Sequence, residues 1–241
     1  MKTLCFDFGN TRQKVAVFRN DVFEEEITLP NDEMFTIERV MYVHQPQRTI
    51  LASVINHNPA IESLLASQSK FHKLSHLTKI NFTTPVGKPE TIGADRLALS
   101  AAAVHFHPGK NNLVIGLGSC ITYNFINQYN EFLGGSISPG MHMRFKAMEV
   151  FTAKLPEVHA EWNFPLIGYD TKTNMQSGVI AGIAFEMDGF IHEYAQKYGN
   201  FNVVLTGGDS AYFARRLKNK IFADPNFLFK GLYALSETNN A

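Results

Sequence analysis

Two segments of the chain, 109 residues apart, repeat one order of features: an apolar strand, a glycine-containing turn and a second strand. The first reads FDFGNTRQKVAVF at 6–18, and the second reads IGLGSCITYNFIN at 115–127. Aligning the two places Gly116 opposite Asp7. Solenoid repeats have shorter periods, of about 20–50 residues. The spacing therefore predicts two related halves within the 241 residues.

Strands and helices alternate in a way that predicts layered α/β structure. In the first half, strand patterns fall at 3–8, 14–18, 23–30, 48–54 and 76–82, and helical patterns at 58–69 (with Asn58 as N-cap) and 95–107. After a strand, a glycine turn and a second strand, the later half shows helices at about 140–154 and 174–198, a strand at 202–208 and a helix at 210–218. The break HPGKNN predicts a domain boundary, with domains at 1–108 and 109–241.

The composition excludes several classes of protein. Lys plus Arg and Asp plus Glu both number 22, so no bulk charge favours nucleic acid or an anionic membrane. No stretch approaches the length of a transmembrane helix and the start has no signal-peptide pattern, so we expect a cytoplasmic protein.

The cysteines and histidines give no sign of a disulfide framework or a metal site. Cys5 and Cys120 cannot form a disulfide framework. His72 and His76 are four residues apart, but Lys73 and the lack of nearby Cys or acidic residues favour a solvated helix face over metal ligands.

Three glycine turns follow apolar strands, at Gly9, at Gly118 and at Gly207–Gly208. Glycine lets backbone N–H groups approach an anion closely, so these turns could bind phosphates, although each could also be a plain hairpin turn. Neither the Walker pattern nor a GxGxxG turn opening a helix occurs in the chain. Any nucleotide site is therefore of another kind.

Two acidic residues stand where they could do chemistry. Asp7, just before the first glycine turn, suits magnesium with Lys14 as a neutralising charge, or it could simply satisfy turn amides. Asp95 could be a helix N-cap or could accept a proton from a substrate hydroxyl, and Arg96 beside it offers a planar fork to a carboxylate or phosphate.

Other charged residues are more ambiguous. The segment 134–148 could shape a binding wall at a helix N-terminus, or be a loop entering an amphipathic helix. Glu186, Asp188 and Glu193 lie on a long predicted helix, and we expect them to be solvated.

Seven motifs follow one another along the chain: DFGNT at 7–11 with Lys14, GADR at 93–96, GLGSCIT at 116–122, GGSISPG at 134–140, TAKLP at 152–156, TNMQSG at 173–178 and TGGD at 206–209. In this order they resemble a type III pantothenate kinase, of the actin, sugar kinase and Hsp70 superfamily. The resemblance spans nearly the whole chain. It implies an α/β fold of two ribonuclease H-like halves, each a mixed sheet with flanking helices, around a nucleotide cleft.

The resemblance also implies an activity: ATP-dependent phosphorylation of pantothenate to 4'-phosphopantothenate, the first step of coenzyme A biosynthesis, in a homodimer with its site at the interface. Asp95 would be the proton acceptor, and Asp7 would bind magnesium. ATP phosphates would contact Asp7, Phe8, Gly9, Asn10, Thr11, Arg12, Gln13, Lys14 and Ser119. Pantothenate would contact Val86, Gly93, Ala94, Asp95, Arg96 and, across the dimer interface, Thr173.

Three positions depart from the family pattern. Gly116 stands where an acid usually binds a monovalent cation, which calls the potassium or ammonium site into question. Asn124 replaces a common acid, and Val86 stands where a pantothenate-contacting tyrosine is expected. These departures leave two alternatives: a kinase for another small hydroxyl substrate, or a non-catalytic nucleotide-binding or regulatory homologue.

Overall fold

The structure is a computed structural model and describes residues 1–85 and 87–239. It contains two five-stranded sheets, and the chain divides into two compact units. The first unit comprises Met1–Gly109, Asn124–Gly134 and Asn226–Ala241, and the second comprises Lys110–Tyr123 and Gly135–Pro225. The boundary at 108/109 stays a prediction, and these two units are described separately below.

The first unit is built on a mixed sheet with the strand order β3-β2-β1-β4-β5. Its strands are β1 (Lys2–Phe8), β2 (Gln13–Arg19), β3 (Val22–Leu29), β4 (Arg48–Ser53) and β5 (Lys70–Lys73). The central strand β1 pairs antiparallel with β2 and parallel with β4. The turn after β1 and the loop after β4 therefore leave the same edge of the sheet, where ligands commonly bind in α/β proteins.

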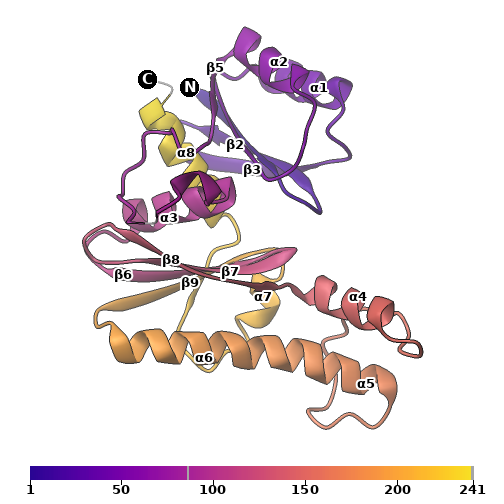
Figure 1. The fold of residues 1–241 in the computed structure, drawn as a ribbon. Coiled ribbons are helices and arrows are strands. Elements are labelled where there is room, and N and C mark those ends of the chain that lie inside the picture. Colours follow the sequence, from indigo (N-terminus) through magenta and orange to yellow (C-terminus); the bar gives the residue numbers. More distant parts are fainter. Residues whose placement is uncertain (86, 240–241) are drawn as a thin grey trace. The chain divides into compact units, whose positions relative to one another are not determined.

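Helices cover both faces of this sheet (Figure 1): α1 (Met34–His44), α2 (Ala60–Gln68), α3 (Ala94–Phe106) and α8 (Phe227–Asn239). One face packs against α1 and α2, where Ile37 and Ile61 join Phe6 and Phe8 in one apolar cluster. On α8, Tyr233 stacks on Phe18 of β2, with ring centroids 4.6 Å apart. Two helical layers thus bury β1, so only its ends can meet a ligand.

The second sheet has the order β10-β9-β6-β7-β8. Its strands are β6 (Asn111–Leu117), β7 (Cys120–Ile126), β8 (Phe132–Pro139), β9 (Phe201–Gly207) and β10 (Phe222–Ala223). The helices after Pro139 are α4 (Met141–Phe151), α5 (Thr171–Gln176), the π-helix η2 (Ser177–Ala181), α6 (Gly182–Lys197) and α7 (Ser210–Phe213). Within the second unit, Figure 1 shows α6 running along one face of the sheet. The α/β fold with a duplicated mixed sheet is as predicted.

The strand predicted at 76–82 is wrong. The fifth strand is the short β5, and the chain turns directly after it: the Thr78 hydroxyl accepts a bond from the Ser75 N–H. The same hydroxyl lies 2.8 Å from Nε2 of His72, which stands in β5 and not on a helix face. Local bonds between side chains and backbone compete with sheet pairing in such polar stretches.

Helix limits also differ from the predictions. Helix α7 ends at Phe213 instead of residue 218. Arg216 lies beyond this end, and its guanidinium donates to the carbonyl of Trp162. Asn58 is not the N-cap of α2, although its side chain accepts from the Ala60 N–H. The 174–198 helix is α5, η2 and α6 in succession. Two helices, α1 and α8, and the three-residue η1 (Pro89–Thr91) are missing from the prediction.

Within residues 1–85 and 87–239, no helix is long and apolar enough to cross a membrane. The two cysteines, Cys5 and Cys120, are both free thiols in strands.

Gly231 sets how closely α8 approaches α3. A Cβ at this position would lie 2.0 Å from the carbonyl oxygen of Ala98, a backbone atom that cannot move aside. We expect Gly231→Ala to lower the free energy of unfolding by about 1–3 kcal/mol, the usual effect of overpacking. Urea unfolding followed by circular dichroism measures the change.

Gly189 on α6 is the matched control, because a Cβ there would meet nothing within 4 Å. Gly189→Ala should stabilise the protein by up to about 1 kcal/mol through helix propensity. Equal effects of the two substitutions would contradict the proposed tight contact between α3 and α8.

Candidate active site

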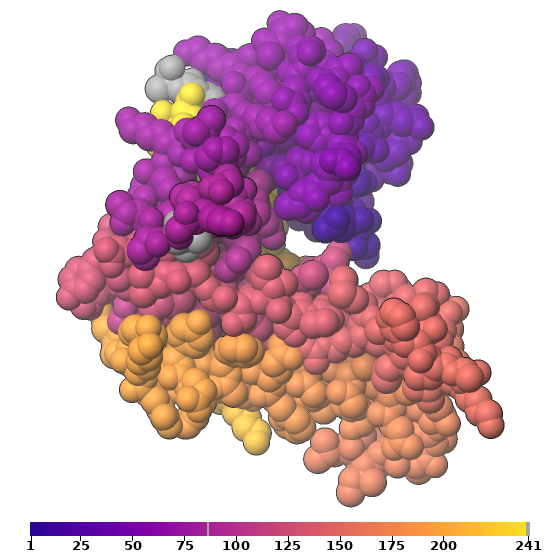
Figure 2. All heavy atoms as spheres, viewed as in Figure 1, coloured from indigo at the N-terminus to yellow at the C-terminus, as the bar shows by residue number. Residues whose placement is uncertain are grey.

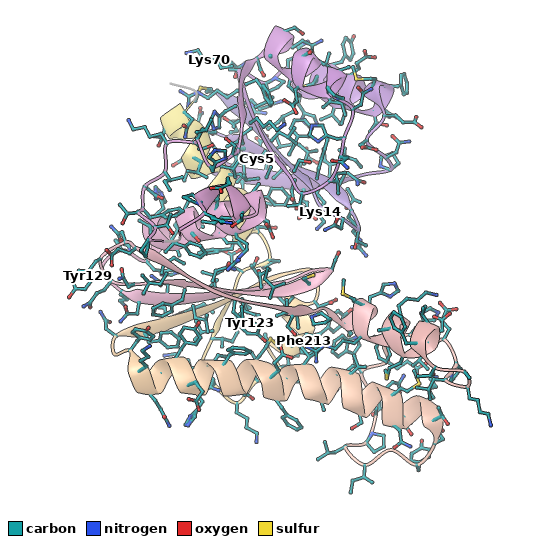
Figure 3. The ribbon with its side chains drawn as sticks, in the orientation of Figure 1. Cys5, Lys14, Lys70, Tyr123, Tyr129 and Phe213 are labelled. Atoms are coloured by element: carbon teal, nitrogen blue, oxygen red, sulfur yellow. The ribbon has the colours of Figure 1, made fainter. Side chains whose placement is uncertain are left out.

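Asp7 lies near the end of β1, beside the first glycine turn. It pairs across the strands with Lys14 of β2, whose ammonium lies 2.6 Å from Oε1 of Glu26 on β3. Lys14 therefore carries a charge that Glu26 partly offsets. Figure 3 labels Lys14 among the side chains of the first unit. An acid, a lysine and a tight turn are thus brought together, as the sequence predicts.

The turn itself is closed by its own backbone. The Gly9 N–H donates to the carbonyl of Arg12 over 3.2 Å, and a Cβ at Gly9 would lie 3.1 Å from that oxygen. The Gly9 amide is thus used within the turn rather than presented to a ligand. Asn10, Thr11 and Arg12 are exposed at its tip.

The side chain of Phe8 is fully buried in the core, so only its backbone borders this turn. Its ring packs edge-on against His57, with centroids 5.5 Å apart. His57 lies in the loop after β4, with one ring nitrogen 2.9 Å from the Ser53 hydroxyl and the other 2.9 Å from Glu62. These two contacts of His57 hold the loop after β4 at the same sheet edge as Asp7, and the sequence analysis did not predict them.

Asp95 stands in the first turn of α3. The helix begins at Ala94 with Gly93 in the N-cap position, so the interpretation of Asp95 as the N-cap is wrong. Instead its carboxylate is hydrogen-bonded by the backbone N–H groups of Asp95 and Arg96. A Cβ on Gly93 would lie 2.5 Å from Oδ1 of Asp95. Because glycine has no side chain, residue 93 leaves room for the Asp95 carboxylate.

Asp7 and Asp95 are electrostatically coupled. Burial, with the nearby charge of Asp95, raises the pKa of Asp7 from 3.8 to about 7, against a lowering effect of Lys14. Burial also raises the pKa of Asp95, while hydrogen bonds and the Arg96 guanidinium lower it. A carboxyl group that ionises reluctantly beside a second carboxyl is suited to binding a cation or a proton.

Arg96, the next residue of α3, is also held in place. Its Nε donates to Oδ1 of Asn124 on β7 over 2.7 Å, and its guanidinium lies over the ring of Phe132 on β8, 5.4 Å from the centroid. Asn124 is fully buried. The sequence singled out both Arg96 and Asn124, but nothing in it indicated that they contact each other.

The second unit brings two glycine turns to neighbouring strand ends. Leu117 of β6 pairs with Gly207 of β9, so the turns at Gly118 and Gly207–Gly208 adjoin. Gly207 has φ +97°, and a Cβ there would lie 2.2 Å from the Leu117 carbonyl. Helix α4 begins beside them, because the Gly140 N–H donates to the Ser119 carbonyl over 3.0 Å. A helix N-terminus next to glycine turns is suited to binding an anion.

Glu186 of α6 is not simply solvated, contrary to expectation. It accepts from the Tyr123 hydroxyl over 2.8 Å and forms an ion pair with Arg144 of α4. Burial tends to raise the pKa of Glu186, but these hydrogen bonds outweigh it and lower the pKa. Figure 3 shows Tyr123 between the sheet and α6. Arg144 also donates to Ser138 and to the Pro139 carbonyl, both over 2.8 Å, which fixes the first turn of α4.

Asp188 is also partnered, since it accepts from the backbone N–H groups of Lys218 and Asn219. Thr173 is buried and completes a capping box at the start of α5: its N–H donates to Oδ1 of the N-cap Asp170, and its hydroxyl accepts from the Asp170 N–H and also donates to Oδ1. Val86 lies outside the described residues. Among the described residues, no group of three His, Cys, Asp or Glu is placed to hold a metal ion.

Comparison with known proteins identifies the family. The profile of the type III pantothenate kinase family matches residues 3–193. The type III pantothenate kinase of Christiangramia forsetii is 40% identical over 238 residues, covering 98% of both chains. That of Bacteroides fragilis strain YCH46 is 39% identical over 241 residues, again with 98% of both covered. The chain belongs to the type III pantothenate kinase family.

Solved structures agree on the fold of this pantothenate kinase family member. A crystal structure of a Baf family protein from Campylobacter jejuni aligns with a TM-score of 0.64 at 21% identity, over 98% of both chains. A glucokinase from an Antarctic psychrotroph aligns with a TM-score of 0.50 at 12% identity, over 98% of this chain and 99% of its own. The family profile and the curated relatives confirm the resemblance that the motifs predict, and these structures show the same fold.

The raised pKa of Asp7 predicts that the free energy of unfolding falls as the pH rises. Well below pH 3.8, Asp7 is protonated in both the folded and the unfolded state. As pH rises to about 7 the unfolded state ionises first, so the folded state loses up to about 4 kcal/mol relative to it. We expect Asp7→Asn to raise the melting temperature at pH 8, without ligands, by an amount that shrinks steadily as the pH falls below 3.8.

Thermal unfolding of both proteins across this pH range measures the difference. Asp21→Asn, the same change at an exposed turn position, is the control. A constant difference between Asp7→Asn and the parent at every pH would refute the raised pKa.

Proposed function

We propose that the protein transfers the γ-phosphoryl group of ATP to the primary hydroxyl of pantothenate, giving 4'-phosphopantothenate, the first step of coenzyme A biosynthesis. One observation carries this proposal: a half-buried carboxyl, Asp95, lies at the start of α3 between the glycine that leaves room for it and an oriented arginine. Family membership supplies the substrate. The reaction needs mainly positioning and charge neutralisation, which such a site provides.

Asp95 is the proposed proton acceptor. Its raised pKa brings the carboxylate nearer to neutral pH, where a base exchanges protons most effectively. The hydroxyl oxygen of pantothenate attacks the γ-phosphorus while Asp95 takes the hydroxyl proton, and the bond from the γ-phosphorus to the β,γ-bridging oxygen breaks to release ADP. Arg96 binds the pantothenate carboxylate through its planar fork. Gly93 and Ala94 border the same ligand by their backbone, because the Ala94 side chain is buried.

Asp7 is the proposed magnesium ligand. Oxygen donors from one or two carboxylates, completed by phosphates and water, match what magnesium takes, and the coupled Asp7 and Asp95 fit that description. A magnesium ion there would neutralise phosphate charge and relieve the repulsion between the two carboxyl groups. The exposed tip at Asn10, Thr11 and Arg12, together with Gln13 and Lys14, supports binding of the ATP phosphates.

The second unit supports a further ATP contact at Ser119. Ser119 stands in a glycine turn beside the N-terminus of α4, and the network around Glu186 fixes that helix. Backbone N–H groups at a helix start favour phosphate oxygens.

We also propose a homodimer in which Thr173 contacts pantothenate of the partner. The segment from α4 to α5, coral in Figure 2, exposes large apolar side chains at Val150, Phe151, Leu166, Ile167 and Tyr169. Exposed apolar side chains of this kind favour association. Because the Thr173 hydroxyl is engaged with Asp170, its proposed contact would require that cap to share its bonds.

Replacing Asp95 tests the proposed base. Asp95→Asn keeps the shape of the side chain but cannot take a proton, so we expect kcat to fall about 10²–10⁴-fold with little change in ATP affinity. The readout is the phosphopantothenate that the purified protein forms from pantothenate and ATP in the presence of magnesium. Asp21→Asn should keep the parental rate, and no product from the parent protein with any monovalent cation would refute the proposed function.

A Gly93→Ala variant extends the same test from charge to placement. The added methyl displaces the Asp95 carboxylate, so kcat should fall although the acid is retained. Full activity of Asp95→Asn would assign the proton transfer elsewhere, and full activity of Gly93→Ala would show that the exact place of the Asp95 carboxylate does not matter.

The cation requirement tests the departure at Gly116. Without a carboxylate at this position, we expect activity to change less than about twofold when potassium or ammonium replaces sodium, because no charged ligand is present to select the ion. Initial rates in the three chloride salts at equal ionic strength measure this. Strong, selective activation by potassium or ammonium would show that another ligand replaces the missing acid.

A further inference from the structure

Lys14 carries a positive charge beside the first glycine turn, and an acid on the next strand already holds that charge. The Lys14 ammonium lies 2.6 Å from Oε1 of Glu26, and the two side chains are 23% and 26% exposed. An ion pair that keeps this access to water contributes little free energy. A ligand of higher negative charge can therefore displace Glu26 from the lysine.

The register of the sheet places Lys14 and Glu26 on the same face as Asp7. Asp7 of β1 stands opposite Lys14 of β2, which in turn stands opposite Thr28 of β3. Glu26 lies two residues before Thr28 on the same strand. Because paired residues, and residues two apart in a strand, point to the same face of a sheet, an acid, a lysine and a second acid form a row across three strands.

Acids outnumber the lysine around this row. Burial raises the pKa of Asp7, the charges of Asp95 and Glu26 raise it further, and the charge of Lys14 lowers it. The ammonium of Lys14 is thus shared between neighbouring carboxyl groups before any ligand arrives. An anion such as a polyphosphate has to draw this ammonium away from Glu26, and the strength of that competition depends on the charge of both partners.

We propose that Glu26 sets the affinity for the nucleotide: its carboxylate competes with phosphate oxygens for the Lys14 ammonium, so the enzyme holds ATP and ADP less tightly than its lysine would allow. Glu26 acts through Lys14 and is a positioning residue, neither a catalytic residue nor a ligand of the nucleotide. The inference rests on the proposed function in one respect, because it takes the ATP phosphates to lie at Lys14.

Glu26→Gln tests the proposal by direct binding. Glutamine keeps the shape of the side chain but carries no charge, so the ammonium of Lys14 becomes available to phosphates. We expect the dissociation constants of ATP and ADP to fall about threefold or more, measured by isothermal titration calorimetry with magnesium and without pantothenate. Adenosine has no phosphate, so its binding should not change. A gain of affinity is decisive because structural damage would weaken binding instead.

Glu24→Gln is the matched control, because it makes the same change two residues earlier in β3. Glu24 forms its ion pair with Arg19, the last residue of β2, whereas Lys14 is the second residue of that strand. The affinity for ATP should therefore stay at the parental value in this variant.

A second pair of variants tests whether Glu26 acts through Lys14. Lys14→Gln should weaken ATP binding, because the ammonium is lost. In that background the further change Glu26→Gln should have little effect, since no ammonium remains for the carboxylate to hold. An effect of the same size in both backgrounds would contradict the proposal, because it would show that Glu26 repels the phosphates directly.

The outcomes separate this inference from the proposed function. Unchanged or weaker ATP binding in Glu26→Gln, or an equal gain in Glu24→Gln, would overturn the role of Glu26 and leave the kinase assignment in place. Because binding is measured without the acceptor, a parent protein that binds ATP but does not phosphorylate pantothenate would overturn the proposed function alone. A parent protein that binds no ATP would overturn both.

Discussion

The cost of holding two carboxyl groups partly out of water is the constraint around which the first unit is organised. Asp7 and Asp95 come from different elements, a central strand and a helix start, and burial raises the pKa of each. Such a pair persists only where the surrounding structure holds it. The core on both faces of β1, the glycine at 93 and the hydrogen bonds at the start of α3 do so. Strain of this kind commonly marks a functional site.

Much of the fold follows from local patterns in the sequence. The strands around Gly9 and Gly118 are apolar runs interrupted by glycine turns, which leave little choice of structure. Helix α1 escaped prediction because its apolar residues do not share one face: Ile37 and Met41 are buried while Phe35 and Tyr42 are exposed. The segment 76–82 failed for another reason, since side-chain hydroxyls took the bonds that a strand would have made.

In the candidate site, too, local sequence signals predict some of the residues but not the contacts between residues far apart in the chain. Asp7 and Asp95 could be identified from the residues and the resemblance, because an acid beside a glycine turn and the GADR motif are local signals. The contact of Arg96 with Asn124 joins residues 28 apart, and that of Tyr123 with Glu186 joins residues 63 apart. No periodicity records such pairs. Glu186 in particular looked solvated because a helical acid usually is, and only the fold places Arg144 and Tyr123 next to it.

The position of α8 bears on how the chain is made. This last helix packs on α3 through Gly231 and stacks Tyr233 on Phe18, so the first unit depends on residues from both ends of the chain. A ribosome delivers the strands of that unit first and its final helix last. The unit that carries Asp7 and Asp95 therefore cannot complete its packing until residues 227–239 have been synthesised, and a chain cut short before residue 227 would leave that face of the β-sheet uncovered by α8.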